Sequence, residues 1–489
     1  MKKVLPLGIT YDDVLLVPQK SRIASRSQVS TQTHASRHIP IAIPFISSNV
    51  DTVTESAMAI AMAKLGGLGI IHRFMSIDRE AAEVHRVKRA EGFVMEAPYT
   101  VGPNQTVKEI RPILKTNNIS SAVVVDAKGK VVGLLTERDM WFLDNDNIKV
   151  SELMTPAKRL ITAKMDISLK EARALFRKHK IEKLPLVARN GSLAGLVTSR
   201  TVFNEIKHPQ ATKDTRQRLR VGAAVGVVGD YIERAQELIK AGVDVIVVDI
   251  AHIHSIHGLA AVKILRRVCR SIDLIAGNIA TAEAARDLVR LDVDALKVGI
   301  GPGGICITRM VAGAGVPQLT AIMDVARIAH RAHIPLIADG GTNYPGDMTK
   351  ALAAGASSVM ITGWLAGTDE SPGSVILRKG QKYKVHRGAA SFSAVASRRI
   401  NGVSGQVTKE LSEQALSAEL EEIVPEGVES FVPYKGAVKD VIYQLVGAVK
   451  SGMSYSNALR VVDLWRNSQF MRISTASFGE SKQHNIEEM

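Results

Sequence analysis

The chain has 489 residues, of which 46% are hydrophobic, and this length suffices for a large α/β domain together with a smaller one. It contains two cysteines, too few for a disulfide framework or a cysteine-ligated zinc site, and it shows neither an apolar run of about 18 residues nor an N-terminal signal, so we expect a cytoplasmic protein without a membrane segment. The formal net charge of +15 comes from dispersed lysines and arginines without interleaved aromatic residues, which argues against nucleic acid as a primary partner and favours small anionic ligands.

Apolar runs of strand length alternate with helical patterns in two separate parts of the chain. The first part has runs at 43–48 and 67–71, with the helical segment Glu55–Lys64 between them. After residue 210 the alternation resumes with further apolar runs at 222–228, 245–249, 274–278, 295–299, 336–339 and 358–362. Eight strands separated by helices are typical of a (β/α)8 barrel, so the sequence predicts an α/β protein of the TIM-barrel class.

The segment between these two parts contains an internal repeat. Val107-Lys-Glu-Ile-Arg is matched by Leu169-Lys-Glu-Ala-Arg, and Gly133-Leu-Leu-Thr-Glu-Arg-Asp by Gly195-Leu-Val-Thr-Ser-Arg-Thr, both at an offset of 62 positions. Each copy predicts a helix, a strand, a hairpin turn, a second strand and a helix. We therefore divide the chain into a first barrel part at 1–93, an inserted domain at 94–208 and a second barrel part at 209–489.

Polar residues stand at the carboxyl ends of several predicted barrel strands, where barrel enzymes hold their active sites. They are Ser47 and Asn49, Asp249, Asn278, and Asp339. A single aspartate after a strand is more often a helix cap than a ligand. Several such residues on one rim predict a site.

The loop after the strand at 295–299 carries the most reactive side chain of this rim. Residues 299–304 contain four glycines and one proline, and Cys306 and Thr308 follow. Glycines let the backbone approach a ligand closely and aim its N–H and C=O groups at it. A thiol on such a loop predicts a nucleophile, and the alternative is a buried structural cysteine beside an ordinary turn.

This loop resembles the catalytic loop of the IMP dehydrogenase and GMP reductase family in its glycine pattern, Cys306 and Thr308. The resemblance implies that Cys306 adds to C2 of a purine nucleotide. It also implies that K+ binds to loop carbonyls in the dehydrogenases, which here would be those of Gly301, Gly303 and Cys306, with Glu480 on the tail segment that reaches a neighbouring subunit's cation site. One position departs from the family pattern, because Gly304 replaces the serine that touches the 5′-phosphate.

The same resemblance implies a nucleotide site on the rim. Asp339 would take both ribose hydroxyls, and Gly341 and Gly363 would offer backbone N–H groups to the phosphate. Glu426 would accept the purine N1–H. The full nucleotide-binding set is Asp339, Gly341, Gly363, Ser391, Glu426 and Ser47.

Catalytic and cofactor roles also follow from the resemblance. Glu370 would work with Thr308 on departing ammonia, as in the reductases. The nicotinamide of NADPH, or of NAD in a dehydrogenase, would lie over the purine. Its contacts would be Asp249, Asn278, Gly299 and Gly301. The opening segment 10–18 would cross the bottom of the barrel.

The repeat resembles a tandem CBS (Bateman) module, which in many proteins binds adenine or guanine nucleotides. The resemblance implies ribose contacts from Thr136 and Asp139 in the first copy and from Thr198 in the second, where Thr201 replaces the aspartate. A carboxylate accepts two hydroxyl hydrogen bonds better than a threonine does, so we expect one good ribose site at most. We expect ATP-type or GTP-type regulators and a homotetramer or homo-octamer. The alternative is a structural insert without a ligand.

The choice between the two reactions depends on a flap beyond the barrel, because both pass through one covalent intermediate. Dehydrogenases that this chain resembles carry an Arg-Tyr pair there, and here the sequence reads Arg398-Arg399-Ile400. His386 also replaces a phosphate-binding tyrosine. The resemblance therefore favours a GMP reductase that uses NADPH.

Two alternatives remain. The chain length, the insert, the Val316-Pro-Gln-Leu run and the tail with Glu480 and His484 resemble bacterial IMP dehydrogenases, which use NAD. The other alternative is a nucleotide-sensing protein on a barrel that has lost its activity, although Cys306, Asp339 and Glu370 are all present.

Overall fold

The computed structural model describes residues 5–90, 93–95, 98–116, 119–400 and 423–481. These form two compact units. The first contains Met1–Ala90, Gln210–Asp214 and Leu219–Met489, and the second contains Glu91–Pro209 and Thr215–Arg218. The boundaries at 90 and 210 lie within a few residues of the expected insertion, and residues 215–218 join the second unit in addition.

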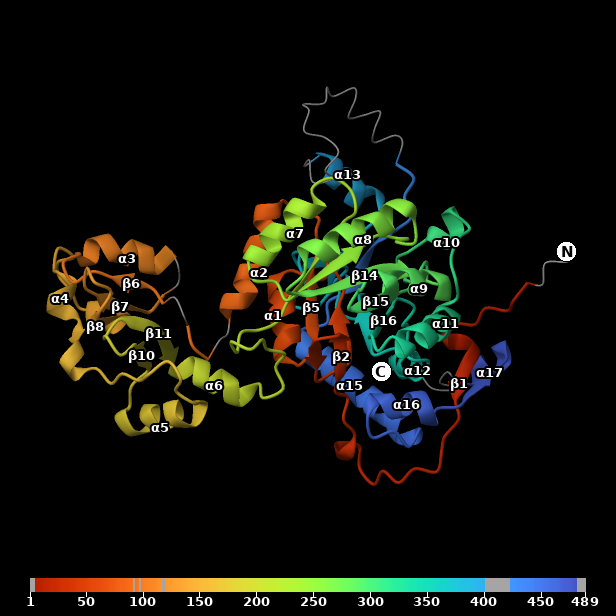
Figure 1. The fold of residues 1–489 in the computed structure, drawn as a ribbon, viewed down its shortest axis with the longest axis horizontal. Helices are drawn as coiled ribbons and strands as arrows, with labels where there is room; N and C mark the ends of the chain where they lie inside the picture. Colours follow the sequence, from red (N-terminus) through yellow and green to blue (C-terminus); the bar gives the residue numbers. More distant parts are fainter. Residues whose placement is uncertain (1–4, 91–92, 96–97, 117–118, 401–422, 482–489) are drawn as a thin grey trace. The chain divides into compact units, whose positions relative to one another are not determined.

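The first unit is built around a closed barrel of parallel strands in the order β12-β13-β14-β15-β16-β17-β4-β5, with helices outside it (Figure 1). The predicted (β/α)8 barrel is thereby confirmed, and the strand ends differ from the expected ones by at most three residues. The strands are β4 (Phe45–Ser47), β5 (Leu68–Ile71), β12 (Gly222–Val225), β13 (Val245–Asp249), β14 (Asp273–Ile279), β15 (Ala295–Val298), β16 (Leu336–Asp339) and β17 (Ser358–Ile361).

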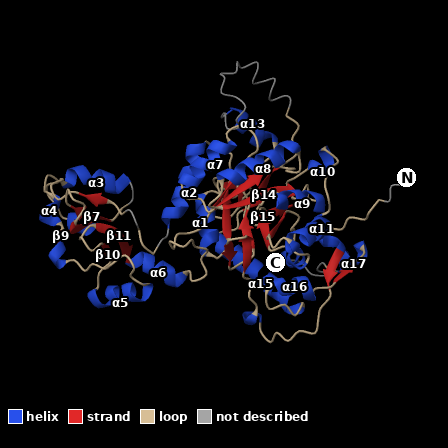
Figure 2. Ribbon diagram, viewed as in Figure 1, coloured by secondary structure: helices blue, strands red, loops and turns tan. Residues whose placement is uncertain are grey.

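Helices follow the strands and shield them, as Figure 2 shows in blue around the red strands. Several begin at a side-chain cap: Ser255 accepts from the N–H of Gly258 and Thr281 from that of Ala284. The described helices of this unit are α1 (Ser56–Lys64), α2 (Ile77–Ala90), α7 (Tyr231–Lys240), α8 (Ile256–Val268), α9 (Ala282–Arg290), α10 (Thr308–Val311), α11 (Gln318–Arg331), α12 (Pro345–Ala353), α13 (Phe392–Ile400), α15 (Val438–Tyr455), α16 (Val461–Asn467) and α17 (Thr475–Glu480). None of the described helices combines the length and the apolarity that crossing a bilayer requires.

Alternate strand residues fill the barrel interior with aliphatic side chains, among them Val245, Val247 and Ala295. Ile39 and Ile41, from the hairpin of β2 (Thr33–Ser36) and β3 (Ile39–Ile41), belong to the same buried cluster. The hairpin therefore closes the amino-terminal end of the barrel.

The opening segment lies elsewhere than the resemblance implied. Its strand β1 (Val14–Leu16) pairs with β21 (Phe470–Arg472), and the N–H of Ile9 donates to Thr320 Oγ1 near the start of α11. The ring of Tyr11 lies beside Gly341, which follows the carboxyl end of β16. The expectation that residues 10–18 cross the bottom is therefore wrong, because hairpin β2–β3 occupies that place.

A small three-stranded sheet follows the barrel strands in sequence. It consists of β18 (Ile376–Arg378), β19 (Gln381–Arg387) and β20 (Glu429–Pro433), with β19 in the middle. The turn at 388–391 begins directly after β19, and the segment at 426–428 ends directly before β20. Both lie against the loop that carries Cys306.

The second unit repeats one arrangement twice. Helix α3, strand β7 and strand β8 begin at Val107, Ser121 and Val131, and their counterparts α5, β10 and β11 begin 62 residues later. The elements are β6 (Thr100–Val101), α3 (Val107–Thr116), β7 (Ser121–Val125), β8 (Val131–Thr136), η3 (Glu137–Met140), α4 (Val150–Leu153), β9 (Thr155–Pro156), η4 (Ala157–Arg159), α5 (Leu169–His179), β10 (Lys183–Val187), β11 (Leu193–Thr198) and α6 (Ser199–Lys207). The closing helix of the first copy is the short 3-10 helix η3, and that of the second is α6.

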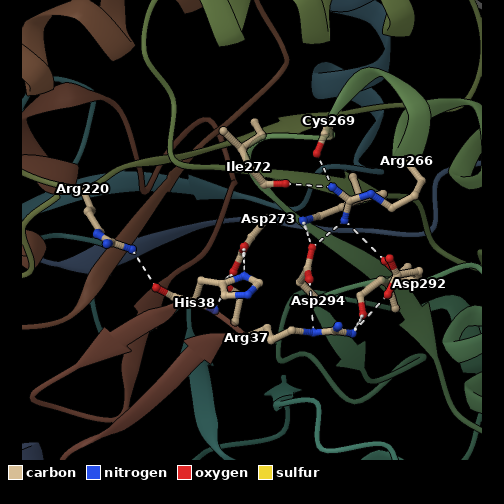
Figure 3. Close-up of polar contacts among 12 residues, drawn as sticks. Arg37, His38, Arg220, Arg266, Cys269, Ile272, Asp273, Asp292 and Asp294 are labelled. Atoms are coloured by element: carbon tan, nitrogen blue, oxygen red, sulfur yellow. Dashed lines mark hydrogen bonds and ion pairs between the residues drawn. The ribbon is translucent and has the colours of Figure 1, made fainter. Parts of the chain in front are cut away.

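Ion pairs tie hairpin β2–β3 to the amino-terminal strand ends (Figure 3). Asp294, directly before β15, accepts from Arg266 Nη1 at 2.6 Å and pairs with Arg37 Nε at 3.3 Å. Asp273, at the start of β14, accepts from the N–H and from Nδ1 of His38. His38, Asp273 and Asp294 are metal-ligand types within 4.8 Å of one another. Because the two carboxylates are already bound by these donors, we interpret the cluster as structural.

Asp294→Asn should destabilise the barrel by about 1.5–3 kcal/mol, because it removes a buried charge-assisted hydrogen bond from Arg266. Calorimetric melting of the full chain measures this effect. Asp292→Asn is the matched control, since the Asp292 side chain is 71% exposed and pairs with Arg37 at 3.3 Å. The control should cost about 1 kcal/mol or less. Equal losses for the two variants would contradict the structural role of Asp294.

Candidate active site

Two aspartates and a lysine meet inside the carboxyl-terminal end of the barrel. Asp249 ends β13, Asp339 ends β16, and Lys297 lies two residues after the inward-facing Ala295 of β15. Successive strand side chains alternate between faces, so all three side chains point inward, one layer above the aliphatic core. The Lys297 ammonium lies 2.7 Å from Asp249 Oδ1 and 2.7 Å from Asp339 Oδ2.

These contacts stabilise the charged forms of Lys297 and Asp249. Burial alone would lower the pKa of Lys297, but the two carboxylates raise it above its ordinary value. Burial would likewise raise the pKa of Asp249, but Lys297 and a hydrogen bond from Asn49 hold it below its ordinary value. Lys297 and Asp249 are therefore both charged at neutral pH.

Asn278, expected to contact the cofactor, is bound within the same cluster. Its Oδ1 accepts from Lys297, and its Nδ2 donates to Asp339 Oδ2 at 2.9 Å and to the carbonyl of Gly299 at 2.6 Å. In this arrangement Asn278 orients Asp339 and the nucleophile loop.

The nucleophile loop leaves β15 along a path that only glycine can take at its first residue. Gly299 has a φ of 151°, and a Cβ there would lie 2.0 Å from the carbonyl oxygen of Asp339. Gly301 has a φ of 79° and packs against Arg309. The loop thus returns against β16 and brings Cys306 over the barrel end.

A chain of hydrogen bonds links the thiol to a carboxylate. Cys306 Sγ lies 3.2 Å from Thr308 Oγ1, and that hydroxyl donates to Glu426 Oε2 at 2.7 Å. The backbone holds the two segments together, because the N–H of Ile307 donates to the carbonyl of Glu426 and the N–H of Val428 to that of Ile305. Cys306 is half-buried and carries no disulfide. The arrangement offers a nucleophile with a proton relay beside it.

The expected role of Glu370 beside Thr308 stays a prediction, and the structure gives its carboxylate another contact. Its Oε2 accepts from the N–H of Val438, the first residue of α15, and so caps that helix. The carboxylate bonded to Thr308 is that of Glu426, for which we expected contact with the purine N1–H. Both residues stay candidates for substrate contact, but Glu426 has the geometry for work with Thr308.

The remaining predicted nucleotide residues surround the Cys306 loop and the neighbouring strand ends. Ser47 ends β4, and its hydroxyl accepts from Thr54 Oγ1. Ser391 is buried and lies beside Gly427 in an isolated bridge. Gly341 follows Asp339 with a φ of 82°, and the carbonyl of Gly363 accepts from Lys435 Nζ. Each follows a barrel strand or touches the segment at 426–428.

The flap is described only in part. The side chains of Arg398, Arg399 and Ile400 lie outside the described part of the structure, as does His484. His386, the residue in place of a tyrosine, is buried, and Thr52 Oγ1 lies 3.0 Å from its Nδ1. Burial, with Lys435 nearby, lowers the pKa of His386 to about 4, so it is neutral at physiological pH.

The expected monovalent cation site stays a prediction. The Gly303 carbonyl accepts from the N–H of Cys306. The Arg309 guanidinium donates to the carbonyl of Ile300, which precedes Gly301, and to the carbonyl of Val316. Glu480 ends α17 and is exposed. The loop therefore already satisfies part of its carbonyl set with its own donors.

In the second unit, the two predicted ribose motifs differ in their acceptors. Asp139 Oδ2 accepts from the N–H and the hydroxyl of Thr136, which leaves Oδ1 without a partner among the described residues. In the second copy Thr201 Oγ1 accepts from the N–H of Thr198 and donates to its carbonyl. Asp139 is thus the one with a spare carboxylate oxygen.

Sequence reasoning missed Lys297 and Arg73 at this site. Arg73 follows β5 by two residues, lies over the Phe74 ring, and has a buried Nε without a hydrogen-bond partner in the described structure. A cation within or directly after an apolar barrel strand was the signal that could have identified both.

Comparison with known proteins shows which family the chain belongs to. A model of the IMP dehydrogenase / GMP reductase domain matches residues 8–484. The chain is 48% identical to the inosine-5′-monophosphate dehydrogenase of Nitrosopumilus maritimus, over 98% of each chain. It is 43% identical to the GMP reductase of Leishmania major, over 99% of this chain and 98% of that one.

A solved structure has a similar fold. The GMP reductase of Trypanosoma brucei in complex with guanosine 5′-monophosphate superposes with a TM-score of 0.90 at 43% identity, over 99% of each chain. Because the family model and these relatives cover nearly the full length, the chain belongs to the IMP dehydrogenase and GMP reductase family of oxidoreductases, which use a nicotinamide cofactor.

Proposed function

We propose that the protein is a GMP reductase, which converts GMP and NADPH into IMP, ammonia and NADP+. The observation that carries the proposal is the chain of hydrogen bonds from Cys306 through Thr308 to Glu426, together with the absence of a tyrosine after Arg398-Arg399 in the sequence. The first feature serves proton transfer beside the sulfur in either reaction of the family, and the second disfavours activation of water and so favours the reductase.

The Cys306 thiolate begins the reaction by adding to C2 of GMP, which turns a flat aromatic carbon tetrahedral. The C2–N bond then breaks and ammonia leaves, so that the purine remains bound through a C2–S bond. NADPH supplies the hydride that C2 accepts. The C2–S electron pair returns to sulfur, which releases IMP and restores the thiolate.

Thr308 and Glu426 handle the proton of the departing amine. The Thr308 hydroxyl lies between the sulfur and the Glu426 carboxylate, so the thiol proton can pass through it to Glu426 as the thiolate forms. The same proton can then return from Glu426 through Thr308 to the departing amine. The segment 426–428 is bonded to the loop on both sides of Cys306, which keeps the relay in place.

Asp339 has the geometry to hold the ribose. Its Oδ2 is occupied by Lys297 and Asn278, and its Oδ1 accepts no hydrogen bond from the described residues. That oxygen can accept the hydroxyls of a ribose. Asp249, on the other side of Lys297, would border the nicotinamide.

IMP dehydrogenase is the second candidate, because the relative with 48% identity carries that name. The inserted domain no longer favours it, since the Leishmania GMP reductase also matches over nearly its whole length. The dehydrogenase would need a base for water, and Arg398 or Arg399 would then take that role.

Purified protein should oxidise NADPH when GMP is added and should produce little or no XMP from IMP and NAD. Absorbance of the nicotinamide measures both reactions, and Cys306→Ala should abolish them while GMP binding persists. Steady formation of XMP from IMP without NADPH consumption in the presence of GMP would make the protein an IMP dehydrogenase.

Glu426→Gln should lower kcat with GMP by about 10²–10⁴, because the relay loses its proton donor and acceptor. Its binding of GMP should change much less. Glu370→Gln is the matched control, which should keep kcat near that of the wild type and lower thermal stability through the weaker cap of α15. A larger loss of kcat from Glu370→Gln than from Glu426→Gln would return the catalytic role to Glu370.

We also propose that the second unit is a tandem CBS module that binds a regulatory purine nucleotide through Asp139. The repeat geometry and the spare Asp139 oxygen support this proposal. The Trypanosoma brucei GMP reductase has been solved with guanosine 5′-triphosphate, at a TM-score of 0.79 to this chain. We expect the nucleotide to shift the assembly between homotetramer and homo-octamer.

ATP or GTP should change the activity or the sedimentation of the wild type, and Asp139→Ala should remove that response without loss of basal activity. Thr201→Asp should add a second binding site, because it restores the aspartate of the motif in the second copy. Equilibrium dialysis counts the sites. A wild type that ignores every purine nucleotide would leave the unit a structural insert.

A further inference from the structure

Lys297 is a buried cation that the reaction scheme above does not use. Its side chain is 3% exposed and its ammonium bridges two strand ends. We propose that Lys297 is a positioning residue, which fixes Asp339 so that one carboxylate oxygen faces the ribose and thereby determines the preference for nucleotides with a 2′-hydroxyl. The proposal rests on the proposed role of Asp339 in GMP binding.

The ammonium is surrounded by three acceptors. It donates hydrogen bonds to Asp339 and Asn278 and forms an ion pair with Asp249 at 2.7 Å. Because these three contacts hold it from three strands, the nitrogen has one favoured position. The two carboxylates and the amide are therefore oriented relative to one another by a single atom.

The same contacts select which oxygen of Asp339 stays available. Lys297 and Asn278 both bind Oδ2, at 2.7 and 2.9 Å. Rotation of the carboxylate would break both bonds, so Oδ1 stays directed away from them. A ligand that brings hydroxyl donors to Oδ1 finds a preformed acceptor and loses little free energy in ordering it.

No other described cation contacts Asp339. Arg73 interacts electrostatically with Asp249. The Tyr11 hydroxyl near Asp339 is buried and has no hydrogen-bond partner among the described residues, and burial together with nearby carboxylates raises its pKa. Without Lys297, Asp249 and Asp339 would be two partly buried carboxylates without the cation between them. One would then take up a proton or turn away.

A second lysine of the same unit provides a matched control. Lys88, on α2, is also buried and also bridges two aspartates, Asp214 at 3.1 Å and Asp244 at 2.6 Å. Asp244 directly precedes β13, so this cluster lies at the opposite end of the barrel. Removal of Lys88 reproduces the loss of a buried cation without touching the rim.

The experiment compares the affinities of GMP and 2′-deoxy-GMP by calorimetry for the wild type and for Lys297→Met, Lys297→Gln, Lys297→Arg and Lys88→Met. The wild type should bind GMP roughly tenfold to a hundredfold more tightly than the deoxynucleotide, since the lost hydrogen bond is to a charged group. In Lys297→Met and Lys297→Gln this ratio should fall below about threefold.

Lys297→Arg should restore part of the ratio, because it keeps the charge. Lys88→Met should keep the full ratio even if its melting temperature falls. A ratio in either neutral Lys297 variant equal to that of the wild type would overturn the proposal. Lys297→Met and Lys297→Gln differ in polarity, and the affinity ratio of either variant that folds is sufficient to test the proposal.

Failure of the proposed function gives a different result. If the wild type does not distinguish the two nucleotides, the ribose role of Asp339 is wrong, and the Lys297 proposal falls with it. If the wild type distinguishes them and reduces GMP, but the neutral variants keep the ratio, only the Lys297 proposal is overturned.

Discussion

The Lys297 ammonium is the contact on which the arrangement of the site depends. From β15 it joins the carboxyl ends of β13 and β16 to the end of β14, so one side chain connects four consecutive strands of the barrel. Burial of an unpaired charge would cost far more than a fold of marginal stability can bear. The full set of acceptors offsets that cost and makes the cluster rigid. The cluster also holds the start of the Cys306 loop in place. Asn278 accepts a hydrogen bond from Lys297 and donates one to the carbonyl of Gly299, the first residue of the loop.

Strand periodicity explains why the charges lie at one level. Val247 and Ala295 point into the aliphatic core, and the residues two positions later, Asp249 and Lys297, point inward one layer higher. The barrel thus has an apolar lower interior, closed by hairpin β2–β3, and a polar upper one. The nucleophile lies above this polar layer, held from the outside by segment 426–428.

Much of this architecture could be predicted from the sequence, because it follows from local patterns. The barrel strands have near-continuous apolar runs, the repeat has a constant offset, and the glycines around Cys306 mark a loop. The assignments that differed depend on contacts between distant segments. Glu370 and Glu426 both follow short polar turns, and only the pairing of 426–428 with the Cys306 loop decides which carboxylate reaches Thr308. The place of residues 10–18 depends likewise on pairing with β21 near the other end of the chain.

The difference between the two reactions of the family comes down to the lifetime of one covalent purine. In the proposed mechanism Thr308 and Glu426 serve proton transfer beside the sulfur, and a relay of this kind suits either departure of an amine or attack by water. What separates the outcomes is a base that activates water before hydride can be delivered. An arginine can be that base only if its surroundings offset its very high pKa. A tyrosine hydroxyl next to it is one group that could help, and this chain has Ile400 there. In the proposed reductase the arginine would lack this help, so the covalent purine would persist until the hydride arrives.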